Sequence, residues 1–441
     1  MINYNKKLKV TFICHFSNPE VRSKLPLSNF WLRNRIKKML RKGVLNKHQD
    51  FAPWVTTLIK EFEKFDDVEL YVISPHSGLR RFTYSFISNG VNYYFFKPEL
   101  PLMLTPLLVK LKLKSNKYLL NRCFIKQFIS SIKPDIVNLI GTENPYYSIA
   151  SLDVKNIPLF VSAQTVYSNP ARQTLTGHVD KERWNLELKI HNKEKYYGVG
   201  GRMHYDLILN NNPNAIIFKF KFPVQKPRIV YNQQKEYDFV FFAAGVTPKK
   251  GVEDAIEALA LVKAKYNGVT LNIVGSCDPE YKQFLDKIIK KLNLQLNVFF
   301  NSYFPLQSDM HNHIQKSRFA LLPVKLDVIS GTIVEAMQLE LPLITYKTTG
   351  TPYLNKDGET VLISDIGDIK ALASNMLKFM DNTAFANELA KKAKAFAEKE
   401  FDNTSNARLL VECYRAVMDH YHNNTPIPDK LLFNIEEFPT Y

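Results

Sequence analysis

Short apolar runs alternate with amphipathic helical stretches along almost the whole of this 441-residue chain. In the second half, strand-like runs occur at 239–243, 270–274, 297–300, 319–322, 343–345 and 361–363, with helix-like stretches between them at about 251–266, 279–293, 332–340 and 367–381. This alternation is typical of a parallel sheet covered by helices on both faces. It predicts one doubly wound α/β domain in the second half.

The first half repeats the pattern, with strand-like runs at 8–13, 69–73, 136–140 and 159–161. Prolines at 223 and 227 interrupt it. We therefore predict an α/β fold of two doubly wound, Rossmann-like domains, 1–224 and 225–402, followed by a terminal helix and tail at 403–441. Domains of this kind that face a central cleft bind ligands in the loops that follow their strands.

Composition narrows the class of protein further. No segment approaches the roughly 20 uninterrupted apolar residues that cross a bilayer, and the start of the chain lacks the features of a secretory signal. These features predict a cytoplasmic location. The cysteines, Cys14, Cys123, Cys277 and Cys413, have no paired spacing and are expected to be free thiols. No carboxylate pair suited to a metal stands out, so we expect neither a metal ion nor another cofactor.

The most informative stretch joins a strand to a helix at 321–337. Ser330, Gly331 and Thr332 precede or begin the helix, and amides at a helix start can bind a diphosphate without a cationic side chain. Glu335 is placed to accept hydrogen bonds from ribose hydroxyls, and Asp327 to reach a sugar hydroxyl. The alternative is an ordinary capped helix in which Ser330 or Thr332 is the N-cap.

Two other loops follow strands of the same predicted sheet. In the first, Ala244 and Gly245 permit close backbone approach, and Lys249 or Lys250 can neutralise phosphate charge; the alternative is an exposed basic loop. In the second, Gly350 can close on a phosphate or sugar, although Gly before Thr-Pro also occurs in ordinary turns.

Together these three loops resemble those of retaining glycosyltransferases of family 4, the glycosyl transferases group 1, whose fold is called GT-B. The resemblance covers 239 to about 400 well and the first half only loosely. It implies that Glu335 binds the ribose of a nucleotide-sugar donor, Asp327 contacts the donor sugar, and Lys250 contacts the diphosphate. Two departures are Asp327 in place of Glu, and Gly245 in place of an arginine that helps to hold the diphosphate.

The resemblance also implies acceptor-side positions in the first domain. Glu143 lies in a loop that follows a strand, and Gln164 stands where many members have a histidine. Gln cannot exchange protons at neutral pH, whereas His15, after the first strand, is a further candidate. Retaining transfer needs no protein base if the leaving phosphate takes the acceptor proton, as the resemblance implies.

Charge is distributed unevenly between the two halves. Residues 1–224 hold 34 Lys and Arg against 16 Asp and Glu, and residues 225–441 hold 25 against 26. The first half therefore carries a charge of +18 and the second half a charge of −1, which together give the net charge of +17. The basic amphipathic stretches 29–42 and 102–117 fit an anionic membrane surface, or else solvated faces of core helices. Nucleic acid is a weaker alternative, since no recognition motif accompanies the charge.

The sequence thus predicts a glycosyltransferase, of hexosyltransferase type, that extends a surface polysaccharide from a nucleotide-sugar donor on a saccharide or lipid-linked acceptor. It is expected to lie peripherally on the inner face of the cell membrane. The alternatives are a nucleotide-sugar epimerase or synthase of the same architecture, and a non-catalytic basic protein that binds nucleic acid or membrane.

Overall fold

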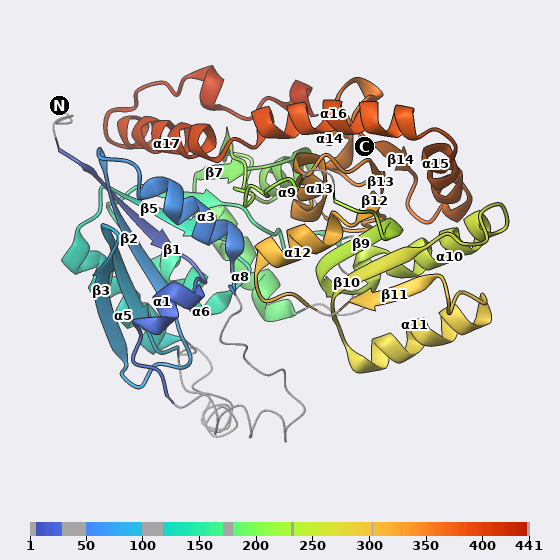
Figure 1. Ribbon diagram of the computed structural model, residues 1–441. Helices are drawn as coiled ribbons and strands as arrows, with labels where there is room; N and C mark the ends of the chain where they lie inside the picture. Colours follow the sequence, from blue (N-terminus) through green and yellow to red (C-terminus); the bar gives the residue numbers. More distant parts are fainter. Residues whose placement is uncertain are drawn as a thin grey trace. The chain divides into compact units, whose positions relative to one another are not determined.

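The computed structural model describes residues 6–28, 50–98, 118–170, 180–230, 233–301, 303–327 and 329–438. The chain forms two compact units (Figure 1). Unit 1 contains Met1–Gly200, His204–Pro223 and Asn403–Phe433, and unit 2 contains Gly201–Met203, Val224–Asp402 and Asn434–Tyr441. The basic stretches 29–42 and 102–117 lie outside the described residues.

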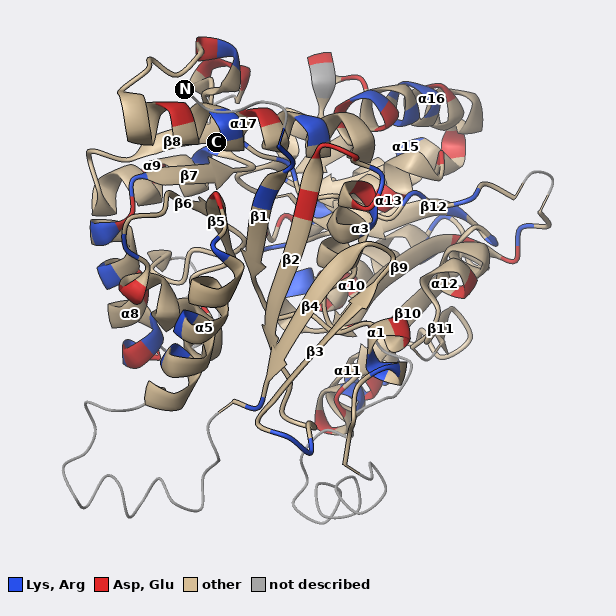
Figure 2. Ribbon diagram, turned by 90° about the vertical axis from the view of Figure 1, so that its left-hand side faces the viewer, with Lys and Arg blue, Asp and Glu red and all other residues tan. Residues whose placement is uncertain are grey.

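Unit 1 contains an eight-stranded sheet in the order β3-β4-β2-β1-β5-β6-β7-β8. Its strands are β1 (Leu8–Ile13), β2 (Val68–Pro75), β3 (Thr83–Ser88), β4 (Val91–Phe96), β5 (Ile136–Ile140), β6 (Leu159–Ser162), β7 (Tyr196–Val199) and β8 (Ile216–Lys219). All neighbouring pairs are parallel except β3 with β4. The hairpin strands β3 and β4 contain no charged residue and are tan throughout in Figure 2.

The helices of unit 1 are α1 (Pro19–Ser23), α3 (Pro53–Phe62), α5 (Leu119–Ile132), α6 (Pro145–Ser148), η2 (Ile149–Asp153), α8 (Lys181–Lys193), most of α9 (Arg202–Asn211), α17 (Asn403–Asn423) and η5 (Asp429–Leu431). Helix α17 comes from the far end of the chain, yet Leu410, Val411 and Tyr414 are part of the core of unit 1. The buried Tyr414 hydroxyl accepts a hydrogen bond of 2.6 Å from the Nδ2 of Asn138 on β5.

Unit 2 contains a six-stranded, wholly parallel sheet in the order β11-β10-β9-β12-β13-β14. Its strands are β9 (Tyr237–Val246), β10 (Leu271–Cys277), β11 (Val298–Asn301), β12 (Ser317–Leu322), β13 (Leu343–Tyr346) and β14 (Leu362–Ser364). Its helices are η3 (Pro248–Lys250), α10 (Val252–Lys263), α11 (Pro279–Lys291), α12 (Gln307–Ile314), α13 (Gly331–Gln338), α14 (Thr351–Leu354), η4 (Lys356–Gly358), α15 (Ile369–Asp381), α16 (Thr383–Glu400) and η6 (Ile435–Glu437).

The central strand β9 shows why helices cover both faces of this sheet. Phe239 and Phe241 face a core built with α10, α11 and α15, whereas Val240 and Phe242 face a second core built with α13 and α16. Successive side chains of a strand point to opposite faces. Because residues 239–243 of β9 are all apolar, this part of the strand is buried on both sides. The predicted α/β class is confirmed.

The sequence-based division treats 403–441 as a terminal helix and tail. In the structure, Asn403–Phe433 belongs to unit 1 and the chain then returns to unit 2 at Asn434. Within unit 2 the ring of Phe438 stacks on that of Tyr353, with centroids 4.3 Å apart. Apart from the short stretch Gly201–Met203, which is assigned to unit 2, the chain therefore passes from one unit to the other at 223–224, at 402–403 and at 433–434.

Candidate functional site

Each sheet has one place where the strand order reverses direction. In unit 2 this switch lies between β9 and β12, and in unit 1 between β1 and β5. Ligands of open parallel sheets bind outside the carboxyl ends of the strands at such points. All three loops singled out in the second half follow β9, β12 and β13, which are adjacent in the sheet, so the structure brings them to one edge.

The loops after β9 and β12 are in direct contact. Gly251 has a φ of +77°, and a Cβ there would lie 2.0 Å from the carbonyl oxygen of Pro323. Glycine is therefore required for this close approach. The backbone amides of Lys325 and Leu326 both donate to the carbonyl oxygen of Lys249, at 2.9 and 3.3 Å. These contacts bring the residues beside Lys249 next to those that follow Leu326.

Lys250 and Asp327 meet at this junction, although 77 residues separate them in the sequence. The Lys250 Nζ lies 2.8 Å from the Asp327 Oδ2. The two side chains are 19% and 33% exposed, so solvent and a ligand can reach both. The cation predicted to contact a diphosphate and the acid predicted to contact a sugar are thus in direct contact with each other.

The start of α13 stands directly after this pair. Ser330 is the N-cap residue by its backbone, but its side chain makes no capping hydrogen bond to the first turn; its hydroxyl lies 3.0 Å from that of Thr332. Gly331 is exposed, and a Cβ there would meet nothing within 4 Å. Because the first amides of a helix lack intrahelical acceptors, this helix start offers an open, positively polarised surface to an anion.

Glu335 is buried one turn further into α13, at 8% exposure. Its Oε1 accepts a hydrogen bond of 2.7 Å from the Nε2 of Gln307, and its Oε2 lies 3.4 Å from the Nε2 of the buried His311. Both partners belong to α12. Sequence analysis missed them because α12 was not predicted, and no motif connects residue 307 or 311 to residue 335.

The remaining donor-side positions contribute space rather than charge. Ala244 is exposed and its carbonyl oxygen accepts a hydrogen bond of 2.6 Å from Ser276. Gly245, where the resembled family has arginine, is open: a Cβ there would meet only the Cγ2 of Thr247, at 3.9 Å. Gly350 is the N-cap residue of α14 with a φ of −113°, which any residue adopts.

In unit 1 the structure places the acceptor-side candidates at the carboxyl ends of neighbouring strands. His15 follows β1, is exposed, and stacks on Phe51 with centroids 5.9 Å apart; the surrounding protein disfavours its charged form and lowers its pKa. Glu143 follows β5, where its carboxylate lies against Gly141, which has a φ of +81°. Gln164 follows β6 and is half-buried.

A buried side chain that the sequence did not indicate connects the loops after β5 and β6. Glu187, on α8, is fully buried. Its carboxylate accepts hydrogen bonds from the Thr142 hydroxyl at 2.9 Å and from the amides of Tyr167 and Ser168, both at 2.8 Å. Burial raises its pKa, and these hydrogen bonds oppose that shift. One carboxylate therefore fixes the loop after β5 relative to the loop after β6.

The described ranges were searched for metal sites, disulfides and membrane-spanning helices. Within them, no group of three or more His, Cys, Asp or Glu side chains is arranged to hold a metal ion. The four cysteines are free. No helix among the residues that the structure describes is long and apolar enough to span a membrane.

Comparison with known proteins bears on the same part of the chain. The family model described as glycosyl transferases group 1 matches residues 225–396. The capsular polysaccharide biosynthesis glycosyltransferase CapM of Staphylococcus aureus is 24% identical over 192 residues, which are 43% of this chain and 50% of that protein. The amylovoran biosynthesis glycosyltransferase AmsK of Erwinia amylovora is 26% identical over 179 residues, 39% of this chain and 43% of that protein. The chain thus spans about half the length of these curated relatives.

Solved structures resemble the chain over nearly its whole length. Sucrose-phosphate synthase from Thermosynechococcus elongatus aligns with a TM-score of 0.68 at 13% identity, covering 93% of this chain and 98% of that one. Anabaena HepE in complex with UDP and glucose aligns with a TM-score of 0.63 at 14% identity, covering 92% and 98%. At these identities the likeness concerns the fold alone, which is the GT-B fold of glycosyltransferases.

Proposed function

We propose that this protein is a glycosyltransferase that moves a sugar from a nucleotide-sugar donor to a saccharide or lipid-linked saccharide acceptor, with retention at the anomeric carbon. The observation that carries the proposal is the Lys250–Asp327 pair, 2.8 Å apart beside the open start of α13 at the switch point of unit 2. The match of residues 225–396 to the group 1 glycosyltransferase model supports it, as do relatives named for capsular polysaccharide and amylovoran biosynthesis.

In the proposed reaction, the bond between the anomeric carbon and the diphosphate oxygen breaks, and a bond from that carbon to an acceptor hydroxyl oxygen forms on the same face. The hydroxyl proton passes to the departing diphosphate, so no protein base is needed. Lys250 and the α13 amides stabilise the charge that develops on the leaving group. Asp327 accepts from donor-sugar hydroxyls and Glu335 from ribose hydroxyls, which orients the donor for attack. The proposed reaction requires no metal ion.

On the same hypothesis, the acceptor binds at the switch point of unit 1, where His15, Glu143 and Gln164 follow adjacent strands. Side chains of these types, neutral or acidic, can form hydrogen bonds with the many hydroxyl groups of a saccharide. The +18 charge of residues 1–224 supports a peripheral position on an anionic membrane surface, where a lipid-linked acceptor would be available.

The donor assignment is tested by replacing Glu335. A thermal-shift screen of UDP, GDP, ADP and their common sugar conjugates should first identify a nucleotide that stabilises the wild-type protein. Glu335→Ala should then remove that stabilisation and the transfer of sugar. Glu359→Ala, which removes a 60%-exposed partner of Lys392 in the same unit, is the matched control and should leave both intact. Unchanged nucleotide binding in Glu335→Ala would contradict the site.

The membrane part of the proposal has a separate test. Wild-type protein should sediment with vesicles that contain an anionic phospholipid and not with purely zwitterionic vesicles, and salt should weaken the binding. Replacement by Glu of the cationic residues Arg33, Arg35, Lys37, Lys38, Arg41 and Lys42 should abolish sedimentation. Equal binding to both kinds of vesicle would argue against an electrostatic contact with the membrane.

A further inference from the structure

We propose that Asp254 is a positioning residue that fixes the three donor loops of unit 2 relative to one another and thereby sets the geometry of the Lys250–Asp327 pair. This inference rests on the proposed function for its consequence on donor binding. Its structural basis does not depend on that function, because it consists of contacts among residues of unit 2 alone.

Asp254 stands in the first turn of α10, directly after the loop that follows β9, and is 6% exposed. Its two carboxylate oxygens have different partners. The Oδ1 lies 2.6 Å from the Nζ of Lys325, in the loop after β12. The Oδ2 accepts a hydrogen bond of 2.7 Å from the hydroxyl of Tyr346, the last residue of β13. One buried carboxylate thus joins the ends of three adjacent strands.

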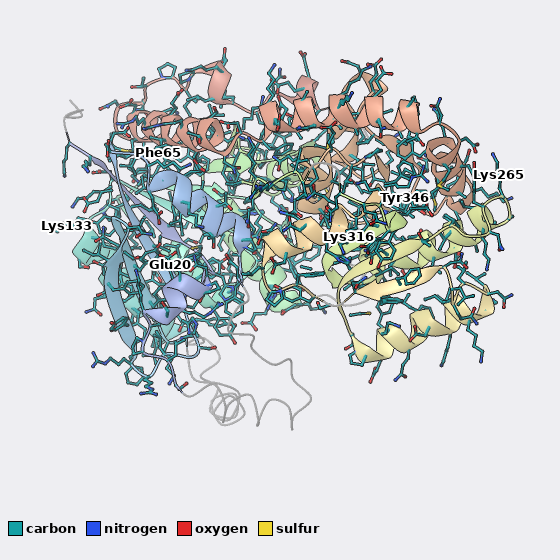
Figure 3. All side chains as sticks on the ribbon, in the orientation of Figure 1. Glu20, Phe65, Lys133, Lys265, Lys316 and Tyr346 are labelled. Carbon is teal, nitrogen blue, oxygen red and sulfur yellow. The ribbon has the colours of Figure 1, made fainter. Side chains whose placement is uncertain are left out.

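The two partners lie next to the residues that carry the site. Lys325 is two positions before Asp327, and its backbone amide already donates to the carbonyl oxygen of Lys249, beside Lys250. Because both the backbone amide and the side chain of Lys325 are bonded, Asp327 has little freedom to move away from Lys250. Tyr346, labelled in Figure 3, immediately precedes the loop that ends at Gly350. The same carboxylate therefore acts on all three loops.

The chemistry of the three groups suits a fixed anchor. Burial and the hydrogen bond to Asp254 raise the pKa of Tyr346, so its hydroxyl keeps its proton and remains a donor. The carboxylate neutralises Lys325, whose ammonium group is thereby committed to the protein rather than to a ligand. Lys250, in contrast, is partly exposed, and its partner Asp327 is a residue of the proposed donor site.

A second aspartate of the same sheet provides a matched control. Asp238, near the start of β9, accepts hydrogen bonds from the amide and hydroxyl of Thr270 at 3.0 and 3.2 Å and from Arg318 at 3.0 Å. It joins neighbouring strands as Asp254 does, but at their amino ends. Loss of either aspartate should weaken the sheet, and only loss of Asp254 should disturb the donor loops.

The experiment compares Asp254→Asn, Tyr346→Phe and Asp238→Asn with the wild type in two measurements. The first is amide hydrogen exchange of the protein without ligand, followed at residues 323–327 and 347–351. The second is the Kd of UDP, or of whichever nucleoside diphosphate stabilises the wild type. We expect Asp254→Asn to speed exchange in both segments and to raise the Kd about tenfold or more, because small displacements of binding groups have large effects. Tyr346→Phe should act mainly on 347–351.

Asp238→Asn should leave exchange at both segments and the Kd unchanged even if it lowers the melting temperature, which separates positioning from general stability. Wild-type exchange and Kd in Asp254→Asn would overturn the inference, as would equal effects of Asp238→Asn and Asp254→Asn. If no nucleotide binds the wild type, the proposed function fails, and the exchange measurement alone decides whether Asp254 holds the loops.

Discussion

The two switch points of this molecule hold their loops in different ways. In unit 2 the loops after β9 and β12 touch each other, through the Lys250–Asp327 pair and the bonds to the Lys249 carbonyl oxygen. In unit 1 the loops after β5 and β6 are both bonded to Glu187 on a helix behind them. The unit 2 switch point carries a cation, Lys250, close to a helix start, and both features would favour the diphosphate of the proposed donor. Of the three positions predicted in unit 1, none is Lys or Arg, which fits a ligand rich in hydroxyl groups.

The largest effect should come from the cation of unit 2. Replacing Lys250 by Met removes the charge proposed to face the leaving diphosphate and should lower the rate of sugar transfer by about 10²–10³-fold, the size of effect seen when one group that stabilises a developing charge is lost. The measurement is kcat with a saturating donor. Lys249→Met, at the exposed neighbouring position, is the control and should stay within about threefold. Equal losses in the two variants would place the functional cation elsewhere.

The next effect concerns the anchor of unit 1. Glu187→Ala removes the acceptor of the buried Thr142 hydroxyl, of the buried Ser168 amide and of the half-buried Tyr167 amide. It should lower the free energy of unfolding of unit 1 by about 3 kcal/mol, since each buried donor left unsatisfied costs about 1–3 kcal/mol. All tryptophans of the chain, Trp31, Trp54 and Trp184, fall within the range of unit 1, so tryptophan fluorescence in urea reports on this unit. Lys189→Ala, an exposed change on the same helix, should alter stability by less than about 0.5 kcal/mol.

A smaller effect should appear when pH is lowered. Burial lowers the pKa of His191 on α8 to about 4, below the value of about 6.5 expected in the unfolded chain. Between these values the unfolded state binds the proton and the folded state does not, so stability falls as pH falls. From pH 7 to pH 5 unit 1 should lose about 2 kcal/mol. The same fluorescence titration of His191→Gln should show a shallower loss; an identical loss would assign it to other groups.

The smallest effect should be a gain at the front of unit 2. Gly245→Arg introduces a cation where the resembled family has one, into space that a Cβ enters without a close contact. The Kd of the stabilising nucleoside diphosphate should fall by up to about tenfold, the value of one added charge-assisted hydrogen bond. Gly245→Gln, a substitution without charge, should not reproduce the gain. If both variants bind alike, the missing arginine does not limit binding.

Sequence patterns revealed most of the strands that lie in the middle of the two sheets. β1 and β5 begin and end at the predicted residues. The six strands of unit 2 were all predicted, five with shifts of one or a few residues, whereas β9 extends beyond its predicted run 239–243 at both ends. Most of these strands are buried on both faces and read as continuous apolar runs, whereas the edge strands β11 and β14 are only partly buried. The hairpin strands β3 and β4 were missed because they are partly exposed and include polar residues, and β7 and β8 because each has only four residues.

For the site, sequence spacing indicated which loops mattered but not what supports them. Lys250, Asp327 and the start of α13 follow strands, and the carboxyl ends of adjacent parallel strands must share an edge. Glu187 and Gln307 lie on helices that pack behind or beside those loops, and Asp254 reads as an ordinary acidic residue in a first helical turn. Their roles depend on distances across the fold, which no local pattern contains.

The membership of α17 in unit 1 has a consequence for protein engineering. If unit 1 binds the acceptor, as proposed, an exchange of acceptor specificity between relatives would normally transplant the amino-terminal segment as one continuous piece. Here that piece would lack Leu410, Val411 and Tyr414 from its core and the partner of Asn138 from its central sheet. The transferable module instead consists of two segments, one that ends at Pro223 and one that spans Asn403–Phe433. A chimera that joins both segments to a foreign unit 2 keeps the hydrophobic core of unit 1 intact.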